Sequence, residues 1–376
     1  MTRSPTAIAL TRELLAFDTI NPPGAEAACA KHLAALLEDA GFAVSFHDLA
    51  PGRPNIVARI GGDGERRALC FTGHMDTVPL GAMPWSRDPF AGEIADGRVY
   101  GRGSSDMKSG IAAFVVAVTA LAPRLGGTPG VVLVLTAGEE TGCEGAAGMV
   151  AAGGVLGAAG AVVVAEPTAN VPFVGHKGAL WLKARTRGVT AHGSMPEKGV
   201  NAVYKAARAI GKLEDFDFNV ERHGVLGAPT LNVGTVHGGI NINSVPDQAD
   251  IGIDIRTVPG QKHAHLRDQM AAYLGDQVEI SAITDVEGVW TDPADPWIRE
   301  VFAVMEDLRG EPPAVSGATF FTDAAYLTPA MGGPPTVILG PGEPAMAHQT
   351  DEYCRVDAID EAVAAYIELT RRWCGL

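Results

Sequence analysis

The side chains in this chain that could do chemistry are carboxylates and imidazoles in five short segments. They are His74 and Asp76 in GHMDTVP, Asp106 in GRGSSDMKSG, Glu139 and Glu140 in TAGEET, Glu166 in VVVAEPT, and His348 in AHQTDEY. Two imidazoles and this many carboxylates can hold a pair of divalent metal ions and still leave one carboxylate for proton transfer. The segments therefore indicate a metal-dependent reaction.

Each segment also has an ordinary structural explanation when it is considered alone. A single histidine at the end of a strand is usually hydrogen-bonded or solvated, and an aspartate in a glycine- and serine-rich loop is usually a turn residue. Adjacent glutamates often begin a solvated helix, where their charge favours the helix dipole. A metal site is favoured because every member has the same placement, after a buried strand or in a glycine-rich loop.

Length and composition limit the class of protein. The 376 residues exceed one ordinary domain, so two domains are expected. The formal net charge of −15 argues against nucleic acid or an anionic membrane surface as the partner. The five cysteines show no CxxC spacing, which argues against a disulfide framework or a zinc ribbon and favours a reducing compartment.

The sequence predicts neither a signal peptide nor a membrane span. The N-terminal segment MTRSPTAIALTRELLAF is interrupted by Arg12 and Glu13, which a signal peptide would not tolerate. The longest apolar run, Ile111–Ala122, is too short to cross a bilayer and predicts a buried helix. We therefore expect a cytoplasmic protein.

The first half of the chain alternates between helix-like and strand-like segments. Helices are predicted at Ala7–Phe17, Glu26–Ala40 and from Ser109 to about Leu125. Strands are predicted at Ala43–Asp48, Asn55–Ile60, Ala68–Thr72, Val131–Thr136 and Ala161–Ala165. The continuous apolar runs are typical of strands that are buried on both faces of a helix-covered sheet. The chemically interesting residues follow the carboxyl ends of such strands, where open α/β sheets bind ligands.

From about Gly178 the pattern changes to alternating apolar and polar residues, which predicts half-buried strands. The predicted elements are a strand at Leu180–Arg187, a helix at Val200–Leu213, strands at Thr230–Val236 and Asp250–Arg256, a helix at His263–Leu274, and a strand at Gln277–Ile283. The apolar face of the first helix is predicted to consist of Val200, Val203, Ala207 and Ile210. His263 and His265 are expected to be solvated. The β-α-β-β-α-β order is that of a ferredoxin-like unit.

After Trp290 the α/β pattern returns, with helices predicted at Pro296–Arg309 and Asp357–Trp373 and a strand at Thr336–Leu339. We therefore expect a discontinuous catalytic domain, residues 1–177 and 286–376, and an inserted domain, residues 178–285. The expected fold class is α/β, with a mixed, helix-covered sheet and an inserted ferredoxin-like α+β domain.

Together, and in this order, GHMDTVP, GRGSSDMKSG, AGEETG, AEPT and GPGEPAMAHQTDEY resemble the signature of the M20 metallopeptidase/amidohydrolase family. That family includes acetylornithine deacetylases, succinyl-diaminopimelate desuccinylases, aminoacylases and glutamate carboxypeptidases. The similarity runs essentially from end to end. It implies a catalytic domain of the zinc-exopeptidase type, an inserted lid domain, and a homodimer formed through that lid.

The resemblance also implies a site with two divalent metal ions. His74 and Glu166 would hold one ion, Glu140 and His348 the other, and Asp106 would bridge them. The expected metal is zinc, with cobalt or manganese as alternatives. Asp76 would orient the His74 imidazole, and Glu139 would be the general base that moves a proton from water to the leaving amine. The family's cis peptide bond is expected at Asp106–Met107.

Five further residues are expected to face the substrate because of the same resemblance. His192, in TAHGSMPEKG, would stabilise the oxyanion, from the neighbouring subunit in dimeric members. Asn243 and Arg256 match lid positions that bind the substrate carboxylate, and Arg offers a planar fork for that contact. Gly317 and Thr319 belong to a loop that closes over the substrate. A turn histidine and a merely solvent-exposed arginine are the competing explanations for His192 and Arg256.

The expected reaction is hydrolysis of an amide bond next to a free carboxylate, with N-deacylation of an N-acyl amino acid favoured. An acetylornithine deacetylase-like activity is the nearest match. A dipeptidase or glutamate-type carboxypeptidase is the alternative, and a non-catalytic metal- or ligand-binding homologue is a more remote one. The bulky Phe320–Phe321 pair leaves the acyl group and the side chain of the substrate open.

Overall fold

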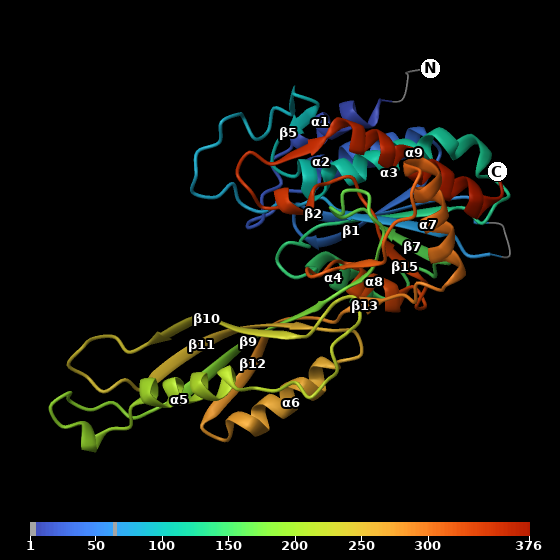
Figure 1. The fold of residues 1–376 in the computed structure, drawn as a ribbon. Coiled ribbons are helices and arrows are strands. Elements are labelled where there is room, and N and C mark those ends of the chain that lie inside the picture. Colours follow the sequence, from blue (N-terminus) through green and yellow to red (C-terminus); the bar gives the residue numbers. More distant parts are fainter. Residues whose placement is uncertain (1–4, 63–65) are drawn as a thin grey trace. The chain divides into compact units, whose positions relative to one another are not determined.

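The computed structural model describes residues 5–62 and 66–376. These residues form two compact units, drawn as ribbons in Figure 1. Unit 1 comprises the described residues up to Gly175 together with Trp290–Gly317 and Thr322–Leu376, and unit 2 comprises His176–Val289 and Ala318–Phe321. The expected boundaries at 178 and 285 lie a few residues inside unit 2. Residues 1–4 and 63–65 of the expected catalytic domain lie outside the described residues.

Unit 1 is built on a mixed sheet with the strand order β1-β2-β6-β3-β7-β15-β8-β13, with β14 paired to β8. The strands are β1 (Ala43–Ala50), β2 (Arg53–Ile60), β3 (Leu69–His74), β6 (Val131–Thr136), β7 (Ala161–Val164), β8 (Phe173–His176), β13 (Val289–Trp290), β14 (Ser316–Ala318) and β15 (Thr336–Ile338). β3 is parallel to both β6 and β7, and β7 is parallel to β15. Every residue of β3, β6 and β7 is buried, as their apolar runs predict. The structure confirms a mixed α/β fold.

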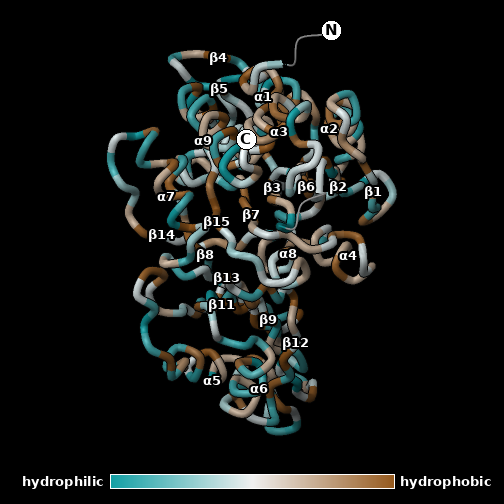
Figure 2. Tube along the Cα trace, turned by 90° about the vertical axis from the view of Figure 1, so that its right-hand side faces the viewer, coloured by the Kyte–Doolittle hydropathy of each residue, from teal (hydrophilic) through white to brown (hydrophobic). Residues whose placement is uncertain are grey.

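Helices lie on both faces of this sheet (Figures 1 and 2). One face carries α1 (Ala7–Leu15), α2 (Ala27–Asp39), α3 (Ser109–Leu121) and α9 (Val356–Cys374), and the other carries α4 (Glu144–Ala152) and α8 (Ala324–Ala330). α7 (Pro296–Arg309) packs against α9. The ring of Phe71 in β3 lies 5.9 Å from that of Phe114 in α3 and 5.4 Å from that of Tyr366 in α9. The main core therefore lies between the sheet and this helical layer.

One helical stretch among the described residues, Ser104–Arg124, is long and apolar enough to cross a membrane. In the structure 78% of its most apolar window is buried inside the protein. Ile111 and Phe114 are fully buried in the unit 1 core. The prediction of a buried helix in this region is confirmed, but the helical stretch is longer than the apolar run Ile111–Ala122, so the expectation that it is too short to cross a bilayer was wrong.

Unit 2 follows the element order β9 (Gly178–Arg187), α5 (Ala202–Glu214), β10 (Thr230–Gly238), β11 (Gln248–Thr257), α6 (His263–Leu274) and β12 (Val278–Val286). Its four strands form an antiparallel sheet in the order β10-β11-β9-β12. β11 alternates strictly between buried and half-buried residues along most of its length, with Ile251, Ile253 and Ile255 buried. These isoleucines pack against α5 and α6 in a core separate from that of unit 1.

Two details of unit 2 differ from the sequence prediction. The fully buried face of α5 is Ala202, Ala206, Ala209 and Leu213. Of the predicted face, Val203 and Ile210 are partly buried against the same core, whereas Val200 is exposed and precedes the helix. The small alanines allow close packing on the sheet, which outweighs the larger apolar residues one position away. His263 is not solvated: it is 1% exposed, and its ring nitrogens face Thr257 Oγ1 at 2.8 Å and Asp285 Oδ1 at 2.7 Å.

A small third sheet, which the sequence did not predict, joins β4 (Glu93–Ala95), β5 (Arg98–Tyr100) and β16 (Tyr353–Arg355). β16 runs antiparallel to β5, so that Tyr353 lies opposite Tyr100. The pairing holds the segment after His348 beside the segment that leads to Asp106. Segments about 250 residues apart in the chain thereby meet in unit 1.

Candidate metal centre

Three adjacent strands of the unit 1 sheet bring most of the predicted metal ligands together. His74 is the last residue of β3, Glu139 and Glu140 follow β6, and Glu166 follows β7 by two residues. The strand order β6-β3-β7 is parallel throughout, so the three carboxyl ends meet at one edge of the sheet. Gly138, with φ +71°, makes the turn between β6 and the two glutamates, a conformation that favours glycine.

Asp106 and His348 come from two loops of unit 1. Asp106 lies in the turn that leads into α3, and the peptide bond to Met107 is cis, as expected from the family resemblance. His348 lies between a short 3₁₀ turn and β16, with φ +64°. A positive φ is uncommon for a residue with a side chain, so this loop fixes an unusual backbone conformation at His348.

The side chains of the five predicted metal ligands, His74, Asp106, Glu140, Glu166 and His348, converge. Asp106 Oδ1 lies 3.0 Å from His74 Nε2, and Asp106 Oδ2 lies 3.5 Å from His348 Nε2. Glu166 Oε1 lies 3.7 Å from His74 Nε2, and Glu140 Oε2 lies 3.1 Å from His348 Nε2. Each oxygen of Asp106 thus faces a different imidazole, and each imidazole has a carboxylate of its own.

The described residues contain two groups of three potential ligands, and within each group the ligand atoms all lie within 4.8 Å of one another. One contains His74, Asp106 and Glu140, and the other contains His74, Glu139 and Glu166. Glu139 is therefore close enough to the cluster either to bind a cation or to exchange a proton beside it. The two roles differ in one measurable respect: removing a direct ligand should lower the number of ions bound, whereas removing a general base should leave the ions in place and lower only the rate.

The cluster holds an excess of negative charge, which shifts the pKa of its members. Burial raises the pKa of all three cluster glutamates, and neighbouring carboxylates add to the rise. Burial alone would lower the pKa of His74, but Glu166 and Asp106 outweigh it and raise that pKa well above its usual value. Hydrogen bonds to Asp106 and Glu140 raise the pKa of His348 to about 10. A bound cation would relieve this excess of charge.

The residues present fit a divalent metal. Glu140 Oε1 is buried without a hydrogen-bond partner, and an acceptor in that state is costly unless something positive faces it. His74 Nδ1 lies 2.9 Å from the backbone oxygen of Asp76. When Nδ1 donates to this oxygen, the neutral ring presents the Nε2 lone pair to the cluster. Imidazole and carboxylate donors of this kind suit zinc and its neighbours among the transition metals.

Asp76 does more than the sequence predicts for it. Its carboxylate lies 3.6 Å from His74 Nδ1, but it accepts hydrogen bonds from the backbone N–H groups of Glu139, at 3.1 Å, and Glu140, at 3.3 Å. Asn21 Nδ2 donates to the same carboxylate at 2.9 Å and to Thr141 Oγ1 at 3.0 Å. Asp76 therefore links the His74 strand to the glutamate turn, and Asn21 is a buried partner that sequence reasoning missed.

Two further residues, Cys143 and Asp323, make contacts near Glu139 that the sequence did not predict, although Asp323 belongs to the loop expected to close over the substrate. The thiol of Cys143 lies 3.7 Å from Glu139 Oε1, and Cys143 is fully buried with φ +60°. Asp323 accepts a hydrogen bond from Thr136 Oγ1 at 2.5 Å, and burial raises the pKa of this carboxyl to about 6. No periodicity or spacing in the sequence could have linked these positions, because only the folded sheet edge brings them together.

The predicted substrate residues are distributed over both units. Gly317 lies in β14 of unit 1, and Thr319 is exposed on the segment that belongs to unit 2. His192 and Asn243 are exposed on adjacent loops of unit 2, where Gly193 N donates to Asn243 O at 2.7 Å.

Arg256 lies on β11 and is held from several sides. Its Nε lies 3.0 Å from Asp254 Oδ1, and its guanidinium carbon lies 5.9 Å from the ring centroids of both Trp181 and Phe321. The ion pair and the two aromatic rings together fix the plane of the guanidinium. Solvent exposure is therefore not the whole explanation for this arginine.

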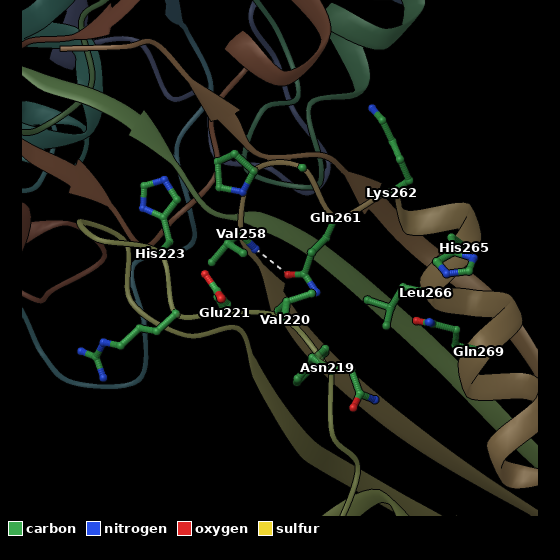
Figure 3. A pocket seen from close by; sticks show the side chains of 14 residues that line it. Asn219, Val220, Glu221, His223, Val258, Gln261, Lys262, His265, Leu266 and Gln269 are labelled. Carbon is green, nitrogen blue, oxygen red and sulfur yellow. Dashed lines mark hydrogen bonds between the residues drawn. The ribbon is translucent and has the colours of Figure 1, made fainter. Parts of the chain in front are cut away.

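Figure 3 shows a pocket of about 620 Å³ within unit 2, between the 218–223 segment and the start of α6. Gln261 accepts a hydrogen bond from Val258 N there, and Lys262, His265 and Gln269 are among the lining residues. None of the predicted catalytic, substrate-binding or metal residues lines this pocket.

The fold and the cluster define an α/β protein with a candidate two-metal centre. The model of peptidase family M20/M25/M40 matches residues 70–372. A succinyl-diaminopimelate desuccinylase from Cereibacter sphaeroides is 32% identical over 386 residues, which cover 97% of this chain and 98% of the relative. An acetylornithine deacetylase from Myxococcus xanthus is 32% identical over 393 residues, which cover 99% and 98% of the two chains.

A solved structure, that of an M20 family metallo-carboxypeptidase from Sulfolobus solfataricus, is similar with a TM-score of 0.82 at 19% identity. The similarity covers 99% of this chain and 100% of the other. The chain belongs to the M20 family and is a hydrolase of that family, so the resemblance seen in the sequence is confirmed.

Proposed function

We propose that this protein is an amidohydrolase with two divalent metal ions that removes the acyl group from an N-acyl amino acid. The observation that carries the proposal is the position of Asp106, whose two oxygens each face a different imidazole. A carboxylate in that position can bridge two ions. Names of relatives at about 30% identity, acetylornithine deacetylase and succinyl-diaminopimelate desuccinylase, support amide hydrolysis on a carboxylate-bearing substrate.

In this proposal His74 and Glu166 would hold one metal ion, and Glu140 and His348 would hold the other. Zinc is the proposed metal, with cobalt or manganese as alternatives. When bound, such ions polarise a carbonyl group and make water more acidic. Asp76 supports the arrangement by fixing both the His74 strand and the backbone of the glutamate turn.

Glu139 is proposed as the general base. It is 5% exposed, and its carboxylate lies in the same group of atoms as His74 and Glu166. From there it would take a proton from water at the cluster and give it to the leaving nitrogen. Burial and the neighbouring carboxylates raise the pKa of Glu139, so its carboxylate is a stronger base than that of an ordinary glutamate and can hold a proton between the two steps.

We further propose that unit 2 is a ferredoxin-like lid domain and that unit 1 is the catalytic domain. The β-α-β-β-α-β element order and the antiparallel sheet of unit 2 support the lid assignment. Arg256, with its plane fixed by Asp254 and two aromatic rings, would bind the substrate carboxylate. Gly317 and Thr319 would line the substrate on a segment that leads directly into Asp323 at the cluster.

The geometry of unit 2 favours action of His192 and Asn243 on the substrate of a second subunit. Both lie at the Gln248 end of β11, because His192 pairs with Ser244 and Asn243 precedes it. Arg256 is eight residues further along the same strand, which is about 27 Å at the usual rise per residue. One small substrate cannot touch both ends, so we infer that a partner subunit supplies the first pair.

A homodimer through unit 2 fits its exposed surface. β10 is an edge strand of the four-stranded sheet, and an unpaired edge can extend a sheet across two chains. Unit 2 exposes several apolar side chains: Val236 on this edge, Ile240 and Ile242 in the loop after β10, and Tyr204 in α5. Exposed apolar groups of this kind are typical of subunit interfaces. The proposed location is the cytoplasm, because all five cysteines are free thiols, as is usual in a reducing compartment.

A peptidase is the alternative within the family, favoured by the M20 metallo-carboxypeptidase among the similar structures. The test compares hydrolysis of N-acetyl and N-succinyl amino acids with hydrolysis of unblocked dipeptides, each with zinc or cobalt added. We expect turnover of the N-acyl amino acids and loss of activity after chelation. Turnover of the dipeptides alone would overturn the deacylase proposal and leave the metal centre intact.

A further inference from the structure

A buried carboxylate outside the predicted ligand set organises the loop that carries Asp106. Glu352 is 0% exposed, and its partner Arg102 is 1% exposed. Glu352 Oε2 accepts from Arg102 Nη1 at 2.6 Å and from Gly103 N at 3.0 Å. Glu352 Oε1 accepts from Ser105 N at 2.7 Å and from Asp106 N at 3.0 Å. One carboxylate therefore holds four donors from a five-residue stretch that ends at Asp106.

All four partners of the Glu352 carboxylate are hydrogen-bond donors, so they are satisfied only when both Oε1 and Oε2 are acceptors. A glutamine would turn one of its ends into a donor and would set an –NH₂ group against two N–H groups. Two of the four hydrogen bonds would then be lost, and buried donors would be left unpaired. The position therefore requires the carboxylate itself and not merely a polar side chain of the same length.

Glu352 also ties the two ligand loops to each other. It lies four residues after His348, and its backbone oxygen accepts from Gly101 N at 2.9 Å. Ser105 Oγ donates to Tyr353 O at 2.7 Å and accepts from Glu343 N at 2.9 Å. The loop that ends in Asp106 is thus bonded to residues that precede and follow His348 in the sequence, through bonds that do not involve the side chains of Asp106 and His348.

We propose that Glu352, held by Arg102, is a positioning residue that fixes the place of the Asp106 loop relative to the His348 loop (the loop register). Asp106 is the proposed bridging ligand, and His348 the proposed imidazole of the second ion, so this inference rests on the proposed function. Loss of the register displaces one oxygen of Asp106 from one imidazole. The second ion, which depends on both loops, is affected more than the first, which His74 and Glu166 hold from the sheet edge.

The test measures metal binding directly. Metal-free wild type and Glu352→Gln are titrated with zinc by calorimetry, and cobalt binding is followed by its visible absorption spectrum. Partners outside the direct ligands typically contribute 10- to 100-fold in metal affinity, so we expect the affinity for one of two ions to fall about 10- to 100-fold. The cobalt spectrum of that ion should change, and kcat should fall while KM stays near the wild-type value.

Glu361→Gln is the matched control. Glu361 is also a unit 1 carboxylate in a fork with an arginine, accepting from Arg309 Nε at 2.9 Å and Nη2 at 2.6 Å, and it also accepts from Asn170 at 2.7 Å. None of these hydrogen bonds involves the Asp106 loop or the His348 loop. Substitution of Glu361 should therefore lower the Tm and leave both metal affinities unchanged. A role of Glu352 in stability alone would give the same pattern for both variants.

Wild-type affinity for both ions in Glu352→Gln, with an unchanged cobalt spectrum, overturns the inference. If Glu352→Gln does not fold, Glu352→Asp decides the matter, because it keeps the negative charge but is one methylene too short to reach all four donors. A loss of affinity in this variant supports the register, and wild-type affinity overturns it. Failure of the wild type to bind two ions contradicts the proposed metal centre instead.

Discussion

His176 should make the protein less stable in mild acid. It is fully buried at the end of β8, and its Nδ1 lies 2.8 Å from Lys177 O. Nε2 is buried without a partner, and burial lowers the pKa of this histidine to about 4, against an ordinary value of 6.5. The unfolded chain therefore takes up a proton below pH 6.5, whereas the folded protein does so only near pH 4.

The sign and size of the effect follow from these two pKa values. Stability contributed by the neutral imidazole is fully present above pH 6.5 and falls as the pH decreases toward 4. With 1.36 kcal/mol per pKa unit, the loss between pH 7 and pH 5 is about 2 kcal/mol, and the full loss near pH 4 is about 3 kcal/mol. His176→Asn keeps a donor for Lys177 O but has no proton to gain, so this contribution should disappear.

The assay is urea unfolding of the metal-free chain at pH 7 and at pH 5. The wild type should lose about 2 kcal/mol more than His176→Asn between the two pH values. His265→Asn, at an exposed histidine of α6, is the matched control and should behave as the wild type. Equal losses in wild type and His176→Asn would refute the reasoning, because the buried imidazole would then not be the group that titrates.

Three other outcomes are expected. Mixing inactive His192→Ala with inactive Glu139→Ala chains should restore part of the activity in heterodimers, and no recovery in a verified heterodimer would contradict action across subunits. Asn21→Ala removes a hydrogen-bond donor from Asp76 and should lower kcat by about tenfold with KM nearly unchanged, as is typical for residues that support metal ligands. A wild-type kcat would exclude a supporting role for Asn21. Tyr366→Phe removes the hydroxyl that donates to a buried carbonyl and should lower the free energy of unfolding by about 1 kcal/mol in urea titrations, with no effect on kcat.

The central strands of the unit 1 sheet could be predicted from the sequence because each is recognisable from its own continuous apolar run. The apolar run Val131–Thr136 is long, lies between turn residues, and is buried at every position in β6. The placement of His74 and Glu166 after such runs follows directly, since parallel strands end at the same edge. The cluster could therefore be predicted from local pattern and spacing, with the family resemblance supplying the roles.

Other features depend on contacts that no local pattern encodes. β5 and β16 are three residues long and pair across more than 250 residues of chain, so neither is recognisable alone. The buried face of α5 consists mainly of alanines, which a search for large apolar residues passes over. His263 looks like a solvated histidine in the sequence, but Thr257 and Asp285, six and 22 residues away, bury and bind it. Glu352 likewise gains its role only when two distant loops meet.

The central claim is that Glu139 moves protons beside a metal centre that it does not help to hold. The most direct test is metal content and activity of Glu139→Ala, measured on the same preparation after equilibration with zinc. We expect two ions per chain, as in the wild type, with kcat reduced by at least about a hundredfold, the low end of what a general base contributes. Loss of one ion would make Glu139 a ligand, and two ions with wild-type kcat would contradict the account altogether.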